Sequence, residues 1–306
     1  MRTILITGGT GMVGRALTKA LLQKNYQVII LTRKIQESAA PGVSYALWDV
    51  DKKQIDKAAL EKADAIIHLA GAGVVDKKWT DSYKKEILNS RTKSSALIID
   101  TLKDMVHKVK ILVSASATGY YGEDKIPGHY FTEEDKADDA FLGEVCRLWE
   151  QSVDPATAIG IRVAKLRTGI VLSNEGGAYK EFKGPLNAGI ASILGSGKQV
   201  VSWIHMEDLC RQYIFALENE SIAGAYNAVA PHPVTNKELI ITIAKEVKGK
   251  FYIPVHVPGF VLKIMMGGRS IEILKSATVS ADKIKRAGFT FLYPALESAV
   301  KAIEKK

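Results

Sequence analysis

A glycine cluster near the start of the chain has the spacing of a phosphate-binding turn. Residues 3–14 read Thr-Ile-Leu-Ile-Thr-Gly-Gly-Thr-Gly-Met-Val-Gly, so an apolar run of strand length leads into Gly8, Gly11 and Gly14, and apolar residues at helical spacing follow over 16–22. Glycines let the backbone approach a ligand closely, and the N-terminus of the following helix offers unpaired N–H groups and a positive dipole end. This order predicts a site for the pyrophosphate of a dinucleotide. The alternative is a tight turn without a ligand.

The end of the second predicted strand indicates which dinucleotide would bind. Thr32, Arg33 and Lys34 follow the apolar run 27–31, and no carboxylate comes before Glu37. An acidic side chain here would accept hydrogen bonds from the adenosine ribose and repel an additional phosphate, whereas an arginine can bind the 2′-phosphate through two hydrogen bonds. The sequence therefore predicts NADP(H), with a solvated surface arginine as the alternative.

The composition restricts the class of protein. A chain of 306 residues with 47% hydrophobic and 25% charged residues suits a globular protein with one large α/β unit and a smaller second lobe. No apolar run reaches membrane-span length, and the two cysteines have no paired spacing, so we expect a cytoplasmic protein with no membrane partner and no disulfide framework. The net charge of +9 comes from scattered lysines, which argues against a nucleic-acid partner. The six histidines lack ligand spacing, so no metal site is expected.

Strand and helix patterns alternate through the first half of the chain. Strands are predicted over 3–7, 27–32, 43–48, 64–69, 110–115 and 159–166. Helices are predicted over 12–24, 53–61, 80–106 and 140–152. This alternation predicts an α/β fold with a Rossmann-type, doubly wound parallel sheet.

The second half of the chain has shorter elements. Strands are expected over 200–204 and 225–229, with a helix over 205–219 between them. Further helices are expected near 235–248, 258–266, 280–287 and 294–304. We therefore predict an NADP-binding domain over 1–172, completed by a returning strand–helix–strand section near 200–230. Residues 173–306 would form a smaller, interwoven α+β substrate lobe.

Further motifs carry a resemblance to a known family. Leu69-Ala70-Gly71 after the fourth strand and Ser114-Ala115-Ser116 after the fifth resemble the extended short-chain dehydrogenase/reductases, in the NAD-dependent epimerase/dehydratase superfamily. Five more stretches resemble the atypical branch called "epimerase family protein" (SDR39U type): Ser-Ala-Thr-Gly-Tyr-Tyr-Gly over 116–122, Arg-Thr-Gly-Ile-Val-Leu over 167–172, Gly-Ser-Gly over 195–197, Ser-Trp-Ile-His over 202–205, and Ala-Gly-Phe over 287–289. That branch has an extra C-terminal segment, here near 250–300. The resemblance spans essentially the whole chain.

The resemblance also implies a set of cofactor contacts. The pyrophosphate would lie against Gly8, Gly11, Met12, Val13 and Gly14. The adenosine end would contact Thr32 and Arg33, and the ribose would contact Leu69 and Ala70. The long helix would contribute Glu86 and Arg91, and Leu172 would lie near the nicotinamide. Glu86 and Arg91 are five residues apart, which leaves open that at least one serves the neighbouring helix. Relatives often dimerise through the long helices, so a homodimer is implied as well.

The catalytic pair that this resemblance implies is missing. Reductases of the superfamily use a tyrosine and a lysine four residues later on one helix face, with a serine or threonine at the end of the fifth strand. Ser116 fits the serine position, but Leu142 and Cys146 occupy the other two. Tyr120 and Tyr121 follow Ser116 and are the candidates for the acid. The helix itself offers the carboxylate of Glu144 and the thiol of Cys146, whereas local helix capping explains His205 and Asp208 better than catalysis does.

These observations favour an NADP(H)-dependent oxidoreductase or epimerase-like enzyme. It would act on a small molecule by hydride transfer, with Ser116 polarising the substrate oxygen. Because the tyrosine–lysine pair is missing, a second class of function stays open. It is a non-catalytic NADP(H)-binding protein that regulates a partner, for example in cell division.

Overall fold

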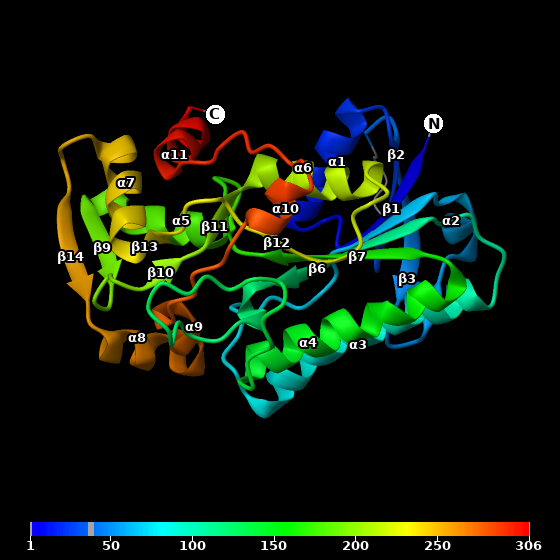
Figure 1. Cartoon of the computed structure of the whole chain (residues 1–306), viewed down its shortest axis with the longest axis horizontal. Helices are drawn as coiled ribbons and strands as arrows, with labels where there is room; N and C mark the ends of the chain where they lie inside the picture. The colour runs from blue at the N-terminus through cyan, green and yellow to red at the C-terminus, as the bar shows by residue number, and fades with distance from the viewer. Residues whose placement is uncertain (1, 36–39, 306) are drawn as a thin grey trace.

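A mixed sheet of eight strands, almost all of them parallel, forms the centre of the molecule (Figure 1), a computed structural model that describes residues 2–35 and 40–305. The strand order is β12-β7-β6-β5-β1-β2-β3-β4, and only β4 runs antiparallel to its neighbour. The strands are β1 (Thr3–Thr7), β2 (Gln27–Thr32), β3 (Val43–Asp49), β4 (Gln54–Ile55), β5 (Ala65–His68), β6 (Ile111–Ala117), β7 (Arg162–Thr168) and β12 (Gly224–Ala228). The predicted Rossmann-type fold is confirmed. The chain order reverses beside β1, which places a crevice at the carboxyl ends of β1 and β5.

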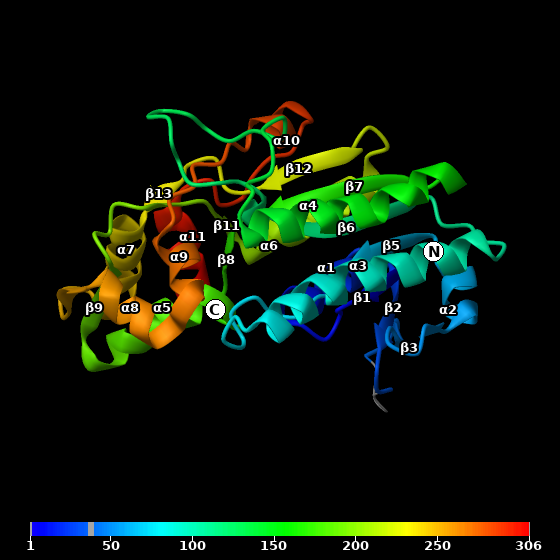
Figure 2. The same cartoon turned by 90° about the horizontal axis from the view of Figure 1, so that it is seen from below.

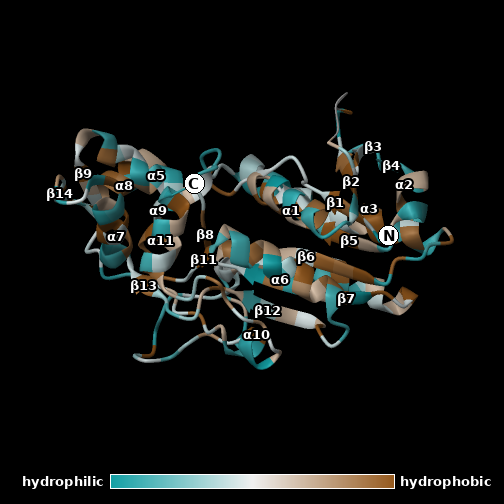
Figure 3. Cartoon of the chain, turned by 90° about the horizontal axis from the view of Figure 1, so that it is seen from above, coloured by the Kyte–Doolittle hydropathy of each residue, from teal (hydrophilic) through white to brown (hydrophobic). Residues whose placement is uncertain are grey.

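Helices cover both faces of the sheet. On one face α1 (Met12–Gln23) and α6 (Met206–Glu218) pack together, and on the other lie α2 (Lys57–Lys62), α3 (Asp81–Lys103), α4 (Phe141–Val153) and the 3₁₀ helix η2 (Asp154–Ile159). Figure 3 shows α1 and α6 side by side above the sheet, with hydrophobic and hydrophilic residues alternating along them. Side chains of β1 alternate between the two cores, since Ile4 and Ile6 face α1 whereas Leu5 faces α2 and α3.

A second group of elements gathers at one end of the molecule (Figure 2). Three two-stranded sheets pair β9 (Ile190–Leu194) with β14 (Ile253–Val257), β8 (Ile170–Leu172) with β11 (Trp203–His205), and β10 (Val200–Val201) with β13 (Val234–Thr235). The helices of this lobe are α5 (Gly177–Lys183), α7 (Asn236–Lys248), α8 (Gly259–Met266), α9 (Ser270–Leu274) and α11 (Leu296–Glu304), with η3 (Gly184–Ala188) and η4 (Gly267–Arg269). Between α9 and α11 the chain passes back along the large sheet. There Val279, Ile284 of α10 (Asp282–Arg286) and Phe289 belong to the core under α1 and α6.

Most predicted elements are confirmed, and most of the differences lie in the small lobe. In the large sheet, the helix expected over 53–61 begins only at Lys57, because Gln54–Ile55 pair with β3 as the edge strand β4. The single strand expected over 200–204 is two short strands, because the Ser202 hydroxyl group binds Ala277 and Val279 of the tail between them. The strands β8, β9 and β14 were not predicted. No described helix is both long and apolar enough to cross a bilayer.

Candidate functional site

The glycine turn between β1 and α1 requires glycine at two of its positions. Gly8 has φ +69°, and a Cβ atom there would lie 2.9 Å from the carbonyl carbon of Leu69. A Cβ atom on Gly14 would lie 2.4 Å from the carbonyl oxygen of Gly8. The N–H of Gly11 closes the turn by donating to the same oxygen at 3.0 Å. These close approaches leave the backbone itself as the surface of the turn.

The N-terminus of α1 is open to a ligand. Its N-cap is Gly11, so no side chain caps the first turn, and no acidic residue lies there. The N–H groups of Met12, Val13 and Gly14 therefore remain donors at the positive end of the helix dipole. This backbone cradle fits the pyrophosphate that the sequence predicts.

The wall opposite the turn is fixed by buried hydrogen bonds. The Thr7 hydroxyl oxygen accepts the N–H groups of Leu69 and Ala70, each at 3.2 Å. Nδ1 of His68 lies 2.7 Å from the same oxygen, and its Nε2 lies 3.1 Å from the hydroxyl of Ser95 on α3. Burial lowers the pKa of His68 to about 4, so the ring is neutral at pH 7. Leu69 and Ala70 are thereby held beside Gly8, as the resemblance implies for a ribose wall.

The two charged residues of α3 that the resemblance assigns to the cofactor, Glu86 and Arg91, differ in burial. Arg91 is buried, donates to the carbonyl oxygen of Ala72 at 3.0 Å, and stacks over the ring of Trp149 on α4. Glu86 is exposed and pairs with Lys77 at 3.3 Å. Arg91 therefore serves the neighbouring helix and the loop after β5, which is the alternative that the five-residue spacing left open.

The end of β2, where the resemblance places the adenosine, carries positive charge. Thr32 ends β2, and its hydroxyl group donates to the carbonyl oxygen of Lys34 at 2.9 Å. Arg33 is exposed and forms no ion pair with any residue that the structure describes. Glu37, the first carboxylate in the sequence after β2, lies outside the described residues.

The three predicted catalytic residues lie together at the end of β6, and two of them belong to a buried network. Ser116 donates to Glu150 of α4 at 2.7 Å, and Glu150 forms two further hydrogen bonds with Arg167 of β7, at 2.8 and 2.9 Å. Tyr121 is fully buried, accepts from Arg167 at 2.9 Å and donates to Asn227 at 2.7 Å. Burial raises the pKa of Tyr121. For either hydroxyl group to donate to a substrate oxygen, its bond inside this network would first have to break.

Tyr120 differs from its neighbour Tyr121. Its side chain is half-buried, and its phenol group has no hydrogen-bond partner among the described residues. The guanidinium group of Arg167 lies 3.5 Å from the centre of its ring. The structure thus separates the two tyrosine candidates, because only Tyr120 leaves its hydroxyl group available.

The positions of the missing pair are packed with apolar groups. A Cβ atom on Gly119 would lie 3.5 Å from Cβ of Leu142 and 3.9 Å from Sγ of Cys146, so both residues sit against the turn that follows β6. Burial raises the pKa of the Cys146 thiol to about 12, which keeps it protonated at neutral pH. Glu144, between them, is exposed.

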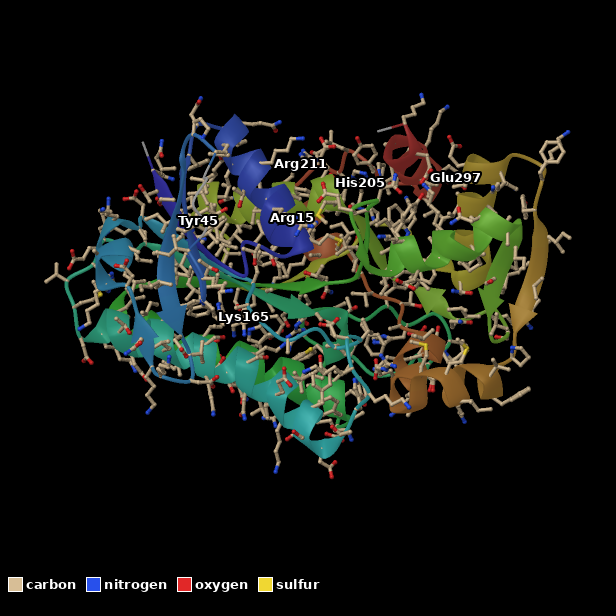
Figure 4. The ribbon with its side chains drawn as sticks, turned by 180° about the vertical axis from the view of Figure 1, so that it is seen from behind. Arg15, Tyr45, Lys165, His205, Arg211 and Glu297 are labelled. Carbon is tan, nitrogen blue, oxygen red and sulfur yellow. The ribbon has the colours of Figure 1, made fainter. Side chains whose placement is uncertain are left out.

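The remaining sequence candidates are Leu172 in β8, His205 at the end of β11 and Asp208 in the first turn of α6. Leu172 is fully buried in the core with Tyr179 and Trp203. Nδ1 of His205 accepts the N–H of Glu207 at 3.1 Å, a helix cap (Figure 4). Asp208 accepts backbone N–H groups of the tail at Leu292 and Tyr293, each within 2.9 Å. The side chains of His205 and Asp208 therefore both hydrogen-bond to backbone groups of the fold. No group of three or more metal-ligating side chains occurs among the described residues.

Two further features were not found from the sequence. Gly176 and Gly177 lie over the start of α1, where a Cβ atom on Gly177 would be 3.2 Å from Cε of Met12. The Lys275 side chain is 9% exposed, and its amine lies 3.7 Å from a carboxylate oxygen of Asp138 and from one of Glu272, without a hydrogen bond. The adjacent glycines can be seen in the sequence, but nothing there shows that they contact Met12. Lys275 and Asp138 are far apart in the sequence, so no local pattern could predict their contact.

Comparisons with known proteins agree with this geometry. A model of the NAD dependent epimerase/dehydratase family matches residues 4–141, and a domain of unknown function (DUF1731) matches residues 257–303. Epimerase family protein SAR0825 of Staphylococcus aureus is 34% identical over 306 residues and covers 100% of both chains. The chain belongs to the NAD-dependent epimerase/dehydratase family. The DUF1731 match falls on the extra C-terminal segment.

Solved structures of the family place the whole chain in the same fold. Human epimerase family protein SDR39U1 (isoform 2), crystallised with NADPH, is 27% identical and covers 99% of each chain with a TM-score of 0.86. The nucleoside-diphosphate sugar epimerase of Corynebacterium glutamicum is 32% identical with a TM-score of 0.76, and the match covers 98% of this chain and 57% of that one.

Proposed function

We propose that this protein is an NADP(H)-dependent oxidoreductase or epimerase-like enzyme that acts on a small carbonyl or hydroxyl compound in the cytoplasm. The observation that carries the proposal is the uncapped N-terminus of α1 behind the Gly8–Gly14 turn, with Arg33 at the end of β2. The turn approaches its own backbone so closely that a side chain at Gly14 would fill the cradle. The NADPH in the crystals of the human relative supports the choice of coenzyme.

The residues at the end of β6 supply the proton side of the reaction. When bound, the reduced nicotinamide supplies a hydride to the substrate carbon, and the carbonyl oxygen then needs a proton. Tyr120 is the proton donor in this proposal, because its phenol group is half-buried and uncommitted. Arg167 holds the ring of Tyr120 from one side, Glu150 holds Arg167, and Ser116 donates to Glu150. Ser116 is then a positioning residue that acts through Glu150.

The test is turnover of NADPH with a panel of aldehydes, ketones, quinones and nucleotide sugars. We expect saturable oxidation with at least one of them, and a loss of about 100-fold or more in kcat for Tyr120→Phe with unchanged affinity for NADPH. Tyr130→Phe is the matched control, because Tyr130 is exposed on the loop that follows. Equal rates in Tyr120→Phe and the parent would remove Tyr120 from the mechanism.

One observation favours the second function, that of an NADP(H)-dependent regulator. Leu142 and the protonated thiol of Cys146 fill the positions of the usual proton-transfer pair, and neither can replace it. Flat rates over the whole panel, together with tight binding of NADPH, would support the regulator and exclude the enzyme.

A further inference from the structure

The outer end of the small lobe exposes apolar side chains that the proposed function does not use. Helices α8 and α9 pack against each other there, at the end of the molecule opposite to α2 (Figure 1 and Figure 2). Single exposed apolar side chains are ordinary, but a group of them on adjoining helices marks a contact surface. Four residues form this group, which we call the α8–α9 patch: Phe260 (65% exposed), Ile264 (78%), Met265 (67%) and Ile271 (63%).

Helix α8 is apolar on its outward side as well as on its inward side. Its sequence is Gly-Phe-Val-Leu-Lys-Ile-Met-Met, so Lys263 is its only polar side chain, and only Leu262 is buried. At about 100° of rotation per residue, Phe260 and Ile264 lie opposite Leu262, and Lys263 lies on the flank between the two sides. A helix that is apolar all round is typical of an element covered on every side. The outward side of α8 is therefore expected to meet an apolar partner.

The chain segment that carries the patch has positive charge only. Residues 247–271 contain no aspartate or glutamate, and their basic residues are Lys248, Lys250, Lys263 and Arg269. None of these four side chains forms an ion pair with a carboxylate of the residues that the structure describes. Glu272, the first carboxylate after the segment, lies 3.7 Å from the amine of Lys275. The partner that covers the patch is therefore expected to be negatively charged as well as apolar.

A second copy of the chain matches this patch poorly. In a two-fold contact the same surface of both copies meets, so basic residues would face each other without a carboxylate from residues 247–271 between them. A protein partner also needs hydrogen bonds at the rim of the contact to fix its orientation, and α8 offers only the amine of Lys263. A fluid bilayer with anionic headgroups has no such requirement, because apolar side chains insert among its acyl chains and lysines attract its phosphates.

We propose that the α8–α9 patch binds the surface of a membrane that contains anionic lipids. Phe260, Ile264 and Met265 insert at the boundary between headgroups and acyl chains, and Lys263 contacts the headgroup phosphates. The missing span-length apolar run predicted no membrane partner, but a surface contact needs only exposed apolar side chains and positive charge. This inference goes beyond the proposed function and does not depend on the coenzyme or on the reaction.

The test is co-sedimentation of the full chain with lipid vesicles. Vesicles of phosphatidylcholine alone are compared with vesicles that contain about 30% phosphatidylglycerol, and we expect at least about tenfold tighter binding to the anionic vesicles. Added NaCl should weaken this binding, because it screens the attraction between lysines and headgroups. Phe260→Ser combined with Ile264→Ser should weaken it about tenfold or more through the lost apolar insertion. Lys263→Glu reverses one charge and should also weaken it about tenfold.

Two matched controls lie away from the patch. Val106→Ser removes an apolar side chain that is 92% exposed in the loop between α3 and β6. Lys57→Glu reverses an exposed charge on α2, at the other end of the molecule (Figure 1). Both should bind the anionic vesicles like the parent. All variants should keep the parental affinity for NADPH and the parental urea midpoint, which shows that a loss of vesicle binding does not come from misfolding.

The outcomes decide the proposal independently of the proposed function. A parent chain that does not bind the anionic vesicles, or that binds neutral and anionic vesicles equally, overturns it. Unchanged binding in the Phe260→Ser and Ile264→Ser double variant also overturns it. If the parent self-associates in sedimentation equilibrium, binds no vesicles, and loses its self-association in the double variant, the patch is a contact between copies and the lipid proposal is wrong. Binding of NADPH in any of these cases leaves the coenzyme proposal intact.

Discussion

Replacing Glu150 by glutamine should cost the protein about 3–5 kcal/mol of unfolding free energy. Glu150 lies between α4 and the sheet with its side chain 8% exposed, and Arg167 opposite is 4% exposed. Glu150 accepts one hydrogen bond from Ser116 and two from Arg167. Glutamine keeps the shape of the Glu150 side chain but removes its negative charge. The guanidinium group of Arg167 then stays buried without its counter-ion, and the cost of burying this unpaired charge is the expected loss of stability.

The effect is measured by urea unfolding at pH 7.5. With an m value of about 3 kcal/mol/M for a chain of this size, the midpoint should fall by about 1 to 1.7 M. Glu150→Leu combined with Arg167→Met should recover much of this loss, because it removes both charges at once. A single Glu150→Gln variant within about 1 kcal/mol of the parent would refute the reasoning that the pair is buried and mutually dependent.

Three further predictions concern the glycine turn and its wall. The pKa of His68 is about 4 in the folded protein and about 6.5 in the unfolded chain. The unfolded chain therefore binds more protons between these values, and stability should fall by up to about 3 kcal/mol as the pH drops from 6.5 to 4. His68→Asn should flatten this pH dependence in urea titrations whereas His256→Asn should not, and an unchanged slope in His68→Asn would contradict the assignment. Gly14→Ala overfills the turn and should weaken NADPH by about 10- to 100-fold in a fluorescence titration, so parental affinity would contradict the close approach. Thr7→Val leaves the N–H of Ala70 and Nδ1 of His68 without their partner, whereas Leu69 keeps the carbonyl oxygen of Thr7 as its acceptor. The substitution should lower the unfolding free energy by about 2 kcal/mol, and parental stability would show that these groups find new partners.

The nucleotide-binding half could be predicted from the sequence because its signals are local. The apolar runs of β1 and β5 are buried on both faces, so period and length alone identify them. The glycine turn follows the same logic, since Gly8 and Gly14 are required by contacts within the turn and with the next loop. The small lobe could not be predicted in this way. Strand β14 is almost wholly exposed and contains Pro254, so it lacks the alternation that marks a strand.

The candidate catalytic residues show the same limit at the level of side chains. Ser116 and Tyr121 were singled out by their position after β6, but their partners Glu150 and Asn227 are 34 and 106 residues away in the sequence. Which hydroxyl group remains available depends on those distant partners, and only the structure shows that it is Tyr120. The same reason hid Lys275, whose carboxylate neighbour Asp138 belongs to a different part of the fold.

A calorimetric titration of the unmodified chain with NADPH and with NADH tests most directly whether the turn and Arg33 hold a phosphorylated dinucleotide. We expect NADPH to bind at least about tenfold more tightly than NADH, and Arg33→Ala to remove most of that difference. A chain that releases no binding heat with either coenzyme, or that binds both equally, would contradict this assignment.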